Sequence, residues 1–371
     1  MISFWENVFY KSDIIIVGAG ISGLSLANAL IEKSPNLSVS VLEKDAMPSS
    51  ASTRNAGFAC FGSFTELISD KAGMGKDQML KLVEQRWKGL ELLRKRLGDK
   101  NIDYRNYGGF EILNQEQIRL LDRLEEINDD LKGIFGINVF SEKIKLISKF
   151  NFNPDWCKAL LFNPLEGQLH SGLMIKRLRE LATERGVQIF SGIEINNYKD
   201  LGKAVELYSV EGHRFLGKKV VFCNNAYLKK LTSDLDIYPG RGLVMISEEM
   251  DLPFEGSFHF DEGFYYFRNV GRRFLIGGGR NEDFKKEETF DKEINENIQN
   301  AIREKSSLIL NGKEFKEEMW WSGIMAFGNS KSPIVKSLSQ NVKIGVRLSG
   351  MGVALASQIA EELSLELVNE M

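Results

Sequence analysis

A chain of 371 residues that is 43% hydrophobic and 27% charged has the composition of an ordinary globular protein. It is too long for one ordinary core, so we expect two domains. The 48 basic and 51 acidic residues are mixed throughout and leave a net charge of −3, which argues against a polyanion-binding surface and so against a nucleic-acid partner.

The three cysteines have no C-x-x-C spacing and the three histidines are dispersed. We therefore predict neither a disulfide framework nor a metal site. No window reaches the ~18 uninterrupted apolar residues of a membrane span, and no cleavable leader is recognisable, so the expected location is the cytoplasm. The chemistry must come mostly from a bound cofactor.

Residues 1–12 carry four apolar side chains in a small amphipathic pattern: Phe4, Trp5, Val8 and Phe9. A lead-in helix packed against the body of the protein and a weak contact with a membrane surface both fit this pattern. We favour packing.

Residues 13–43 predict a strand, a glycine turn, a helix and a second strand. The β-branched run Ile14–Val17 leads into a G-x-G-x-x-G turn. In that turn, Gly18 allows the sharp bend, Gly20 lets the backbone approach a pyrophosphate, and Gly23 lets the helix pack close to the strand.

The pyrophosphate would lie over unpaired N–H groups at the start of the helix Ser22–Glu32. The second strand, Ser38–Leu42, delivers Glu43 about 20 residues after the turn, where a carboxylate can accept a ribose hydroxyl. A dinucleotide site is thus predicted, although a purely structural turn would share the glycines. The motif alone does not separate FAD from NAD.

The segment 46–62, AMPSSASTRNAGFACFG, is rich in small residues and lacks periodicity. A loop of this kind after the acid-bearing strand is expected to run beside the cofactor, with Arg54 free to meet phosphate and 55–57 allowing close backbone approach. A plain surface loop is the alternative, and the apolar run Phe58–Phe61 argues against it.

The middle of the chain predicts a second domain inserted into the first. Asp77–Leu97 and Gln115–Phe135 have helical spacing and read as its packing helices. A return to the nucleotide layer and then an antiparallel region follow: helix Leu173–Thr183, strands Val187–Ser191 and Lys219–Cys223, strands Gly242–Ile246 and Ser257–Phe260, the hairpin Phe264–Arg268 and Arg273–Gly277, and helix Phe290–Leu310. The chain closes with strand Val342–Val346, a second glycine turn and helix Val353–Leu367.

Five segments in this order resemble the D-amino-acid-oxidase-like family of FAD-dependent oxidoreductases, the group of glycine oxidase, sarcosine oxidase and 2-hydroxyglutarate dehydrogenase. They are VGAGISGLSLA, SSASTRNAGF, EGQLHSGLMIKRLRELATERGVQI, FYYFRNVGRRFLIGGGR, and MWWSGIMAFGNSKSPIV leading to RLSGMGVALASQIAEEL. The resemblance covers most of the chain and implies FAD rather than NAD.

The resemblance also implies the cofactor contacts. The N-terminal turn would hold the pyrophosphate, Glu43 the ribose and Ile195 the adenine, while the 54–58 segment would follow the flavin ring. The C-terminal turn would aim N–H groups at flavin N1 and O2. The implied set is Gly18, Gly20, Ile21, Ser22, Gly23, Glu43, Lys44, Arg54, Asn55, Ala56, Gly57, Phe58, Ile195, Asn225, Gly350, Met351, Gly352 and Val353.

The substrate side departs from the family. The position of the usual carboxylate-binding arginine corresponds to Met325, and a lysine of sarcosine oxidases has become Ala354. We hypothesise that Arg280 supplies the missing bidentate contact; a neutral or unusual substrate is the competing inference.

Two further catalytic candidates follow from the resemblance and from the chemistry. Tyr265 matches a pocket tyrosine of glycine oxidase and would bond a carboxylate, with a core position as its alternative; Tyr266 should face the other side of the sheet. An amine with a free lone pair needs no protein base, whereas a 2-hydroxy acid does. His259 is the candidate for that base, with a purely structural histidine as its alternative.

The predicted fold is α/β: a Rossmann-like FAD-binding domain (1–62, 160–235 and 325–371), of the glutathione-reductase-like kind, interleaved with an α+β substrate domain (63–159 and 236–324) on a large mixed or antiparallel sheet. The predicted function is oxidation of a small amine, amino acid or 2-hydroxy acid by hydride transfer to flavin N5. Oxygen or another acceptor would re-oxidise the flavin.

Two alternatives stay open from the sequence: an NAD-dependent dehydrogenase, and a flavin-binding interaction module without catalysis. Substrate identity, the electron acceptor, covalent attachment of flavin and the oligomeric state are not determined by the sequence.

Overall fold

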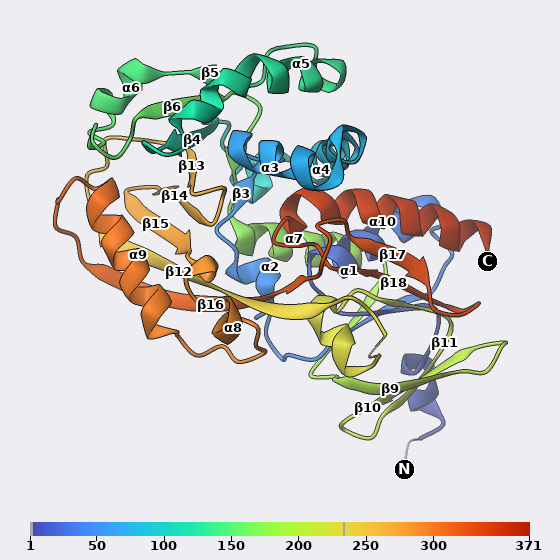
Figure 1. The fold of residues 1–371 in the computed structure, drawn as a ribbon. Helices are drawn as coiled ribbons and strands as arrows, with labels where there is room; N and C mark the ends of the chain where they lie inside the picture. The colour runs from blue at the N-terminus through green and yellow to red at the C-terminus, as the bar shows by residue number, and fades with distance from the viewer. Residues whose placement is uncertain (1–2, 233) are drawn as a thin grey trace.

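The computed structural model describes residues 3–232 and 234–371, which form two eight-stranded sheets with helices between and around them (Figure 1). The first sheet has the order β17 (Ile334–Ser337), β18 (Val342–Val346), β11 (Arg214–Phe222), β1 (Lys11–Val17), β2 (Val39–Glu43), β8 (Gln188–Ser191). Its four central pairings, β18–β11–β1–β2–β8, are parallel. This is the predicted nucleotide-binding layer, with the second strand and its acid where the sequence placed them.

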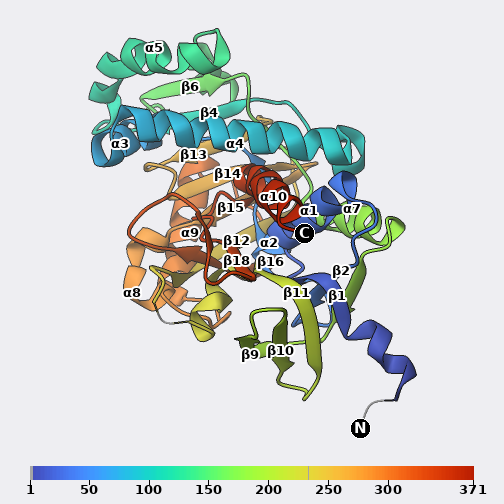
Figure 2. The same cartoon turned by 90° about the vertical axis from the view of Figure 1, so that its right-hand side faces the viewer.

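Alternate residues of β1 enter two different cores, as expected for a strand buried on both faces. Ile14 and Ile16 pack on one face with three long helices, α1 (Ile21–Lys33), α7 (Ser171–Glu184) and α10 (Gly352–Asn369). Ile15 and Val17 pack on the other face with the antiparallel extension β9 (Ile195–Asp200) and β10 (Val205–Ser209). Helix α4 (Lys76–Leu97) crosses over α10, as Figure 2 shows.

The second sheet has the order β16 (Glu317–Phe327), β12 (Tyr238–Glu249), β15 (Arg273–Gly278), β14 (Tyr265–Val270), β13 (Ser257–Phe260), β4 (Gly109–Leu113), β6 (Ala159–Asn163), β5 (Ser141–Glu142). All its pairings are antiparallel except β13–β4, so it is the mixed sheet that was predicted. A two-stranded ladder, β3 (Phe58–Ala59) with β7 (Gly167–Gln168), lies apart from it.

Among the residues that the structure describes, six further α-helices lie outside the group that packs on the first sheet. They are α2 (Ala51–Arg54), α3 (Phe64–Met74), α5 (Leu124–Phe135), α6 (Ile144–Lys149), α8 (Phe284–Glu287) and α9 (Glu296–Ile309). Helix α9 covers one face of the second sheet with Ile298, Ile302 and Ile309, against a cluster dominated by phenylalanines. The opposite face of that sheet is turned toward β3 and α2, because Val244 and Trp321 pack with Ala56 and Phe58.

Several predicted boundaries need correction. The predicted helix Gln115–Phe135 is a 3₁₀ segment, Ile118–Arg123, followed by α5. The helix expected from Phe290 begins only at Glu296, because the Asn295 side chain caps it by accepting from Asn297 N. The predicted loop after Glu43 contains the short helix α2.

The amphipathic N-terminal segment forms a short 3₁₀ helix, Trp5–Phe9, in agreement with the predicted lead-in helix. The favoured packing role is wrong, because Phe4 and Trp5 are each 79% exposed. Only Phe9 makes an aromatic contact with the body, edge-on to Phe190.

The predicted division into two domains stays a proposal. The first sheet falls within the residues assigned to the FAD-binding domain, but β6 and the last residues of β16 pair in the second sheet. Within the described residues, no helix is long and apolar enough to cross a membrane.

Candidate functional site

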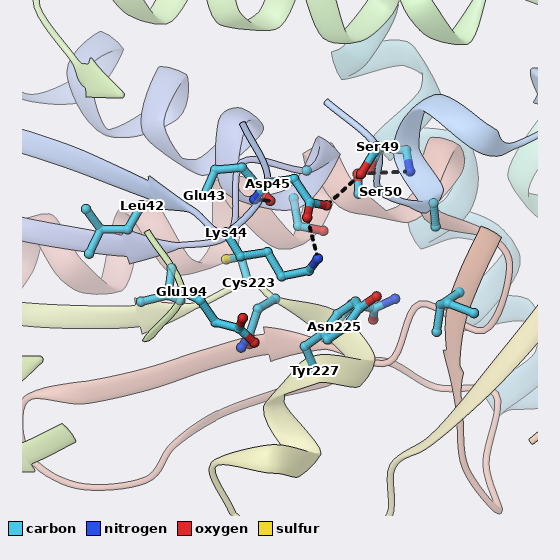
Figure 3. A pocket seen from close by; sticks show the side chains of 18 of the residues that line it. Leu42, Glu43, Lys44, Asp45, Ser49, Ser50, Glu194, Cys223, Asn225 and Tyr227 are labelled. Atoms are coloured by element: carbon cyan, nitrogen blue, oxygen red, sulfur yellow. Dashed lines mark hydrogen bonds and ion pairs between the residues drawn. The ribbon is translucent and has the colours of Figure 1, made fainter. Parts of the chain in front are cut away.

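A crevice of about 950 Å³ opens where the parallel strands of the first sheet end. Its wall includes Val17 and Leu42, the last apolar residues of β1 and β2, and Cys223 just after β11. Ligands of open parallel sheets bind at this edge, beyond the carboxyl ends of the strands. Figure 3 shows Lys44, Asp45 and Ser49 joined by hydrogen bonds on one side of the crevice, with Asn225 and Tyr227 on another.

The N-terminal glycine turn forms one end of this crevice. Gly18 has φ +108°, a conformation that favours glycine, and both Gly18 and Gly20 line the wall. A Cβ on Gly23 would lie 1.9 Å from the Gly18 carbonyl oxygen, so the helix can approach the turn this closely only without a side chain. Ile21 and Ser22, at the start of α1, also line the crevice.

Glu43 holds the turn in shape as well as facing the crevice. One carboxylate oxygen accepts from Ala19 N at 2.8 Å and the other accepts from Asp45 N at 3.1 Å. The side chain is buried and fixed at the carboxyl end of β2. A carboxylate in this place can accept a ribose hydroxyl with its remaining lone pairs.

Ile195, Asn225 and Tyr227 also line the crevice. Lys44 lies over the Tyr227 ring at 4.8 Å and donates to Asp45 at 2.7 Å. Burial lowers the Lys44 pKa, but the Asp45 bond and the Tyr227 oxygen outweigh it, so the pKa is raised. Tyr227 was not among the predicted residues, since nothing in the local sequence relates it to Lys44.

The loop beside the crevice is more tightly held than predicted. Ser49 to Ser52 line the wall, and the Ser52 hydroxyl accepts from Ile21 N at 2.9 Å. Arg54 is not free, because its Nη1 donates to Ser322 O of β16 at 2.8 Å. This bond ties the loop to the second sheet.

Residues 55–58 connect this loop to the segment around Leu169 and to the second sheet. Asn55 accepts from Gly57 N and from the Ser171 hydroxyl. Gly57, with φ +74°, accepts from Leu169 N. Ala56 is buried, and the Phe58 ring packs edge-on against His259 and Tyr266.

The C-terminal glycine turn lies beside the N-terminal one. Gly350 has φ +79°, and Met351 and Gly352 lead into α10. A Cβ on Gly352 would stand 3.7 Å from the Ile21 side chain, and Leu348, just before the turn, lines the crevice. Gly350 to Val353 do not line it themselves. Two helix starts from opposite ends of the chain are thus neighbours, while the predicted contact of the C-terminal turn with the flavin stays a prediction.

His259 lies on the face of the second sheet against which Phe58 of β3 packs. Its Nε2 is sealed from solvent and has no hydrogen-bond partner in the part of the chain that the structure describes. Burial lowers the His259 pKa to about 4, even though the nearby Glu66 carboxylate acts in the opposite direction. The ring is therefore neutral at pH 7.

Tyr265 has the core position that was its alternative reading. It is fully buried, stacks on Phe260 at 5.1 Å and donates to Glu282 at 2.8 Å, in the cluster beneath α9. This placement argues against a substrate contact. Tyr266 faces the opposite side, against Phe58, as period-two alternation requires.

Arg280 follows β15 and forms no ion pair among the described residues. Its guanidinium lies over the Phe327 ring at 3.7 Å and over Phe284 at 4.9 Å, and burial lowers its pKa. Its Nη1 would be 3.4 Å from a Cβ on Gly240, the residue paired with Met325 across β12 and β16. The charge therefore lies next to the strand pair from which the family arginine is missing.

Comparisons with known proteins agree with this geometry. "Probable oxidoreductase OrdL" of Haemophilus influenzae is 23% identical over 363 residues, covering 93% of this chain and 80% of the relative. Human mitochondrial L-2-hydroxyglutarate dehydrogenase is 27% identical over 209 residues, 55% of this chain and 41% of that enzyme.

Solved structures share the fold at low sequence identity. L-proline dehydrogenase from P. horikoshii gives a TM-score of 0.78 at 17% identity, covering 96% of this chain and 93% of the other. Glycine oxidase from Geobacillus kaustophilus gives 0.75 at 19% identity, covering 97% and 95%. These likenesses confirm the predicted α/β fold.

The family comparison settles the question that the glycine motif left open. Residues 13–364 match the family described as "FAD dependent oxidoreductase", DAO, which decides for FAD over the NAD-dependent alternative. A crevice that joins a glycine turn, a helix start and an acid at the end of the second strand fits the ADP half of FAD. The chain belongs to the DAO family of FAD-dependent oxidoreductases, and FAD is its cofactor.

Proposed function

We propose that this enzyme oxidises the C–H bond next to the nitrogen or oxygen of a small amino acid or 2-hydroxy acid, and that Arg280 binds the substrate carboxylate. Bound FAD supplies the acceptor for the hydride. The names of the relatives support this substrate class, since they include glycine oxidase, L-proline dehydrogenase and L-2-hydroxyglutarate dehydrogenase. A small amine without a carboxylate is the broader alternative.

The observation that carries the proposal is the unpaired guanidinium of Arg280. It is half-buried and packs on aromatic rings, and among the described residues it forms no ion pair, although the Glu287 and Glu288 carboxylates lie near enough to act on its pKa. A partly desolvated cation without a counter-ion is costly, and an entering carboxylate would offset that cost through a bidentate contact. Its place next to the Gly240–Met325 pair supports a substitution for the family arginine.

His259 favours the hydroxy acid as the second candidate substrate. Removing the hydroxyl proton of a 2-hydroxy acid requires a base, and a neutral imidazole with an open Nε2 can accept that proton. Tyr266 lies across the Phe58 ring from it, and its hydroxyl has no partner among the described residues, so we propose it in place of Tyr265 as a substrate contact. An amino acid in its neutral-amine form would need neither group as a base.

The test is anaerobic reduction of the purified holoenzyme with a panel of matched amino acids, 2-hydroxy acids and amines that lack a carboxylate. Bleaching of the flavin band near 450 nm by the acids, and not by the corresponding amines, is expected. Bleaching by none of them would overturn the proposed function. Bleaching by amines alone would remove the carboxylate from it.

Two variants separate the roles of the residues. Arg280→Met should raise the Kd for the acid by about 10- to 100-fold, because a hydrogen-bonded charge pair contributes about 1.5–3 kcal/mol, and Arg280→Lys should restore part of it. His259→Gln should slow hydroxy-acid oxidation and leave amino-acid oxidation almost unchanged. Equal acid binding by Arg280→Met and wild type would contradict the proposed clamp.

A further inference from the structure

The cofactor crevice receives a lysine from outside the nucleotide-binding layer. Lys292 lies in the connection between α8 and α9 and lines the crevice together with Ser49 and Ser50. Its Nζ donates to Ser49 O at 3.3 Å and is 3.5 Å from the Ser49 hydroxyl. These residues are 243 positions apart in the sequence, so the contact joins the two halves of the fold.

The backbone of Lys292 is fixed at the same junction. Its carbonyl oxygen accepts from the Ser322 hydroxyl at 2.7 Å, while the Ser322 carbonyl accepts from Arg54. Arg54 is the last residue of α2, whose first residues, Ala51 and Ser52, line the crevice. The lysine is thus carried by a loop that is anchored on β16 and held against the cofactor-side loop.

Lysines and carboxylates both line this wall, but they are not all paired with one another. Lys44 is paired with Asp45, and Glu43 is occupied by two backbone N–H groups, whereas Lys292 has no carboxylate partner among the residues that the structure describes. Burial lowers the Lys292 pKa, and repulsion from Arg54 acts in the same direction. A lysine that has only neutral oxygens as partners in such a place is suited to an anion.

We propose that Lys292 binds the diphosphate of FAD and thereby locks the substrate half of the protein onto the cofactor. The α1 N-terminus lines the same crevice and contacts the serine wall through Ser52, so the diphosphate would meet oriented N–H groups from one layer and an ammonium group from the other. The inference rests on FAD occupying this crevice, as the proposed function requires.

The first test is FAD binding to the apoprotein, followed by flavin fluorescence. Lys292→Met should weaken FAD by about 10- to 100-fold, the range for loss of a charged hydrogen bond, and its affinity should depend less on salt. Lys292→Arg should retain most of the affinity. Lys285→Met serves as the charge-matched control and should bind as wild type, because Lys285 is an exposed lysine of α8 that does not line the crevice.

A second measurement follows the loop itself. Amide hydrogen exchange in residues 288–295 should slow when FAD binds to the wild type and should slow much less in Lys292→Met. FAD affinity of Lys292→Met within threefold of wild type, or equal losses in Lys292→Met and Lys292→Arg, would overturn the inference. A wild-type protein that binds no FAD would instead refute the proposed function.

Discussion

Gly89 is a mid-helix glycine for which helix propensity and packing predict opposite effects of alanine. It lies in α4, where that helix crosses the first turn of α10. Helix propensity alone predicts that Gly89→Ala stabilises the protein by about 1 kcal/mol. In the structure, however, a Cβ at this position would lie 1.9 Å from the Ala354 carbonyl oxygen.

The packing effect should win. The obstacle is the backbone of a second helix, which cannot turn aside as a flexible side chain can, and overpacking of this kind costs about 1–3 kcal/mol. Gly133→Ala is the matched control, because Gly133 lies in α5 with nothing within 4 Å of its Cβ position. There the gain of about 0.5–1 kcal/mol from helix propensity should appear undiminished.

Urea and thermal unfolding of the apoprotein measure the difference. Gly89→Ala should unfold at lower urea and lower temperature than wild type, and Gly133→Ala at higher. Because Ala354 lies in the turn that opens α10, Gly89→Ala should also weaken FAD retention. A Gly89→Ala protein as stable as the Gly133→Ala protein would show that the close approach of α4 and α10 is not required.

Three further outcomes are expected. Burial raises the Glu166 pKa to about 8, so the folded form keeps a proton that the unfolded form releases near pH 4.5. Stability should therefore fall as pH rises from 4.5 to 8, by at most roughly 5 kcal/mol. Glu166→Gln should flatten that slope in urea titrations at several pH values. Arg241→Met should cost about 3–5 kcal/mol, since it strands the buried Glu287 that Arg241 binds at 2.8 and 3.0 Å; the double variant with Glu287→Met should recover much of that loss. Gly23→Ala should purify with little flavin absorbance, because its Cβ would meet Gly18 O, and normal flavin content would contradict the role of that close contact.

The parts of the fold that were predicted well are those with local signals. The β1–α1–β2 unit, strand β13 and strand β18 lie where periodicity and glycine placement put them. The glycine turn needs residues only five positions apart, and Glu43 is held by Ala19, 24 positions before it. Such features can be predicted because the residues that form them lie within one βαβ unit of the sequence.

Side-chain direction in the second sheet was less accessible to sequence analysis. Tyr265 and Tyr266 are adjacent aromatics in β14, and a one-residue change in register exchanges their faces. Only pairing with β13 and β15 decides that Tyr265 enters the core under α9. The comparison with glycine oxidase suggested the opposite, because it matched position in the sequence and not the face of the sheet.

The crevice residues that were missed share a different cause. Tyr227 and Lys292 stand in connections without periodicity, and each meets its partner only after distant segments have folded together. The predicted packing of the N-terminal aromatic residues was wrong for a different reason. An amphipathic pattern indicates which side chains share a face of a helix, but not whether anything covers that face.

The proposed transfer of the carboxylate contact from Met325 to Arg280 has a structural basis in β12. That strand lies between β16 and β15, so a side chain beyond the end of β15 must cross it to reach the family position. Gly240 offers no side chain at the crossing point, where the Phe327 ring and the guanidinium already lie close. Any Cβ at Gly240 would be 2.4 Å from that ring, so a side chain at this position would displace the ring on which Arg280 packs. An arginine that follows β15 can therefore replace one lost from β16 only if the residue of β12 between them is glycine.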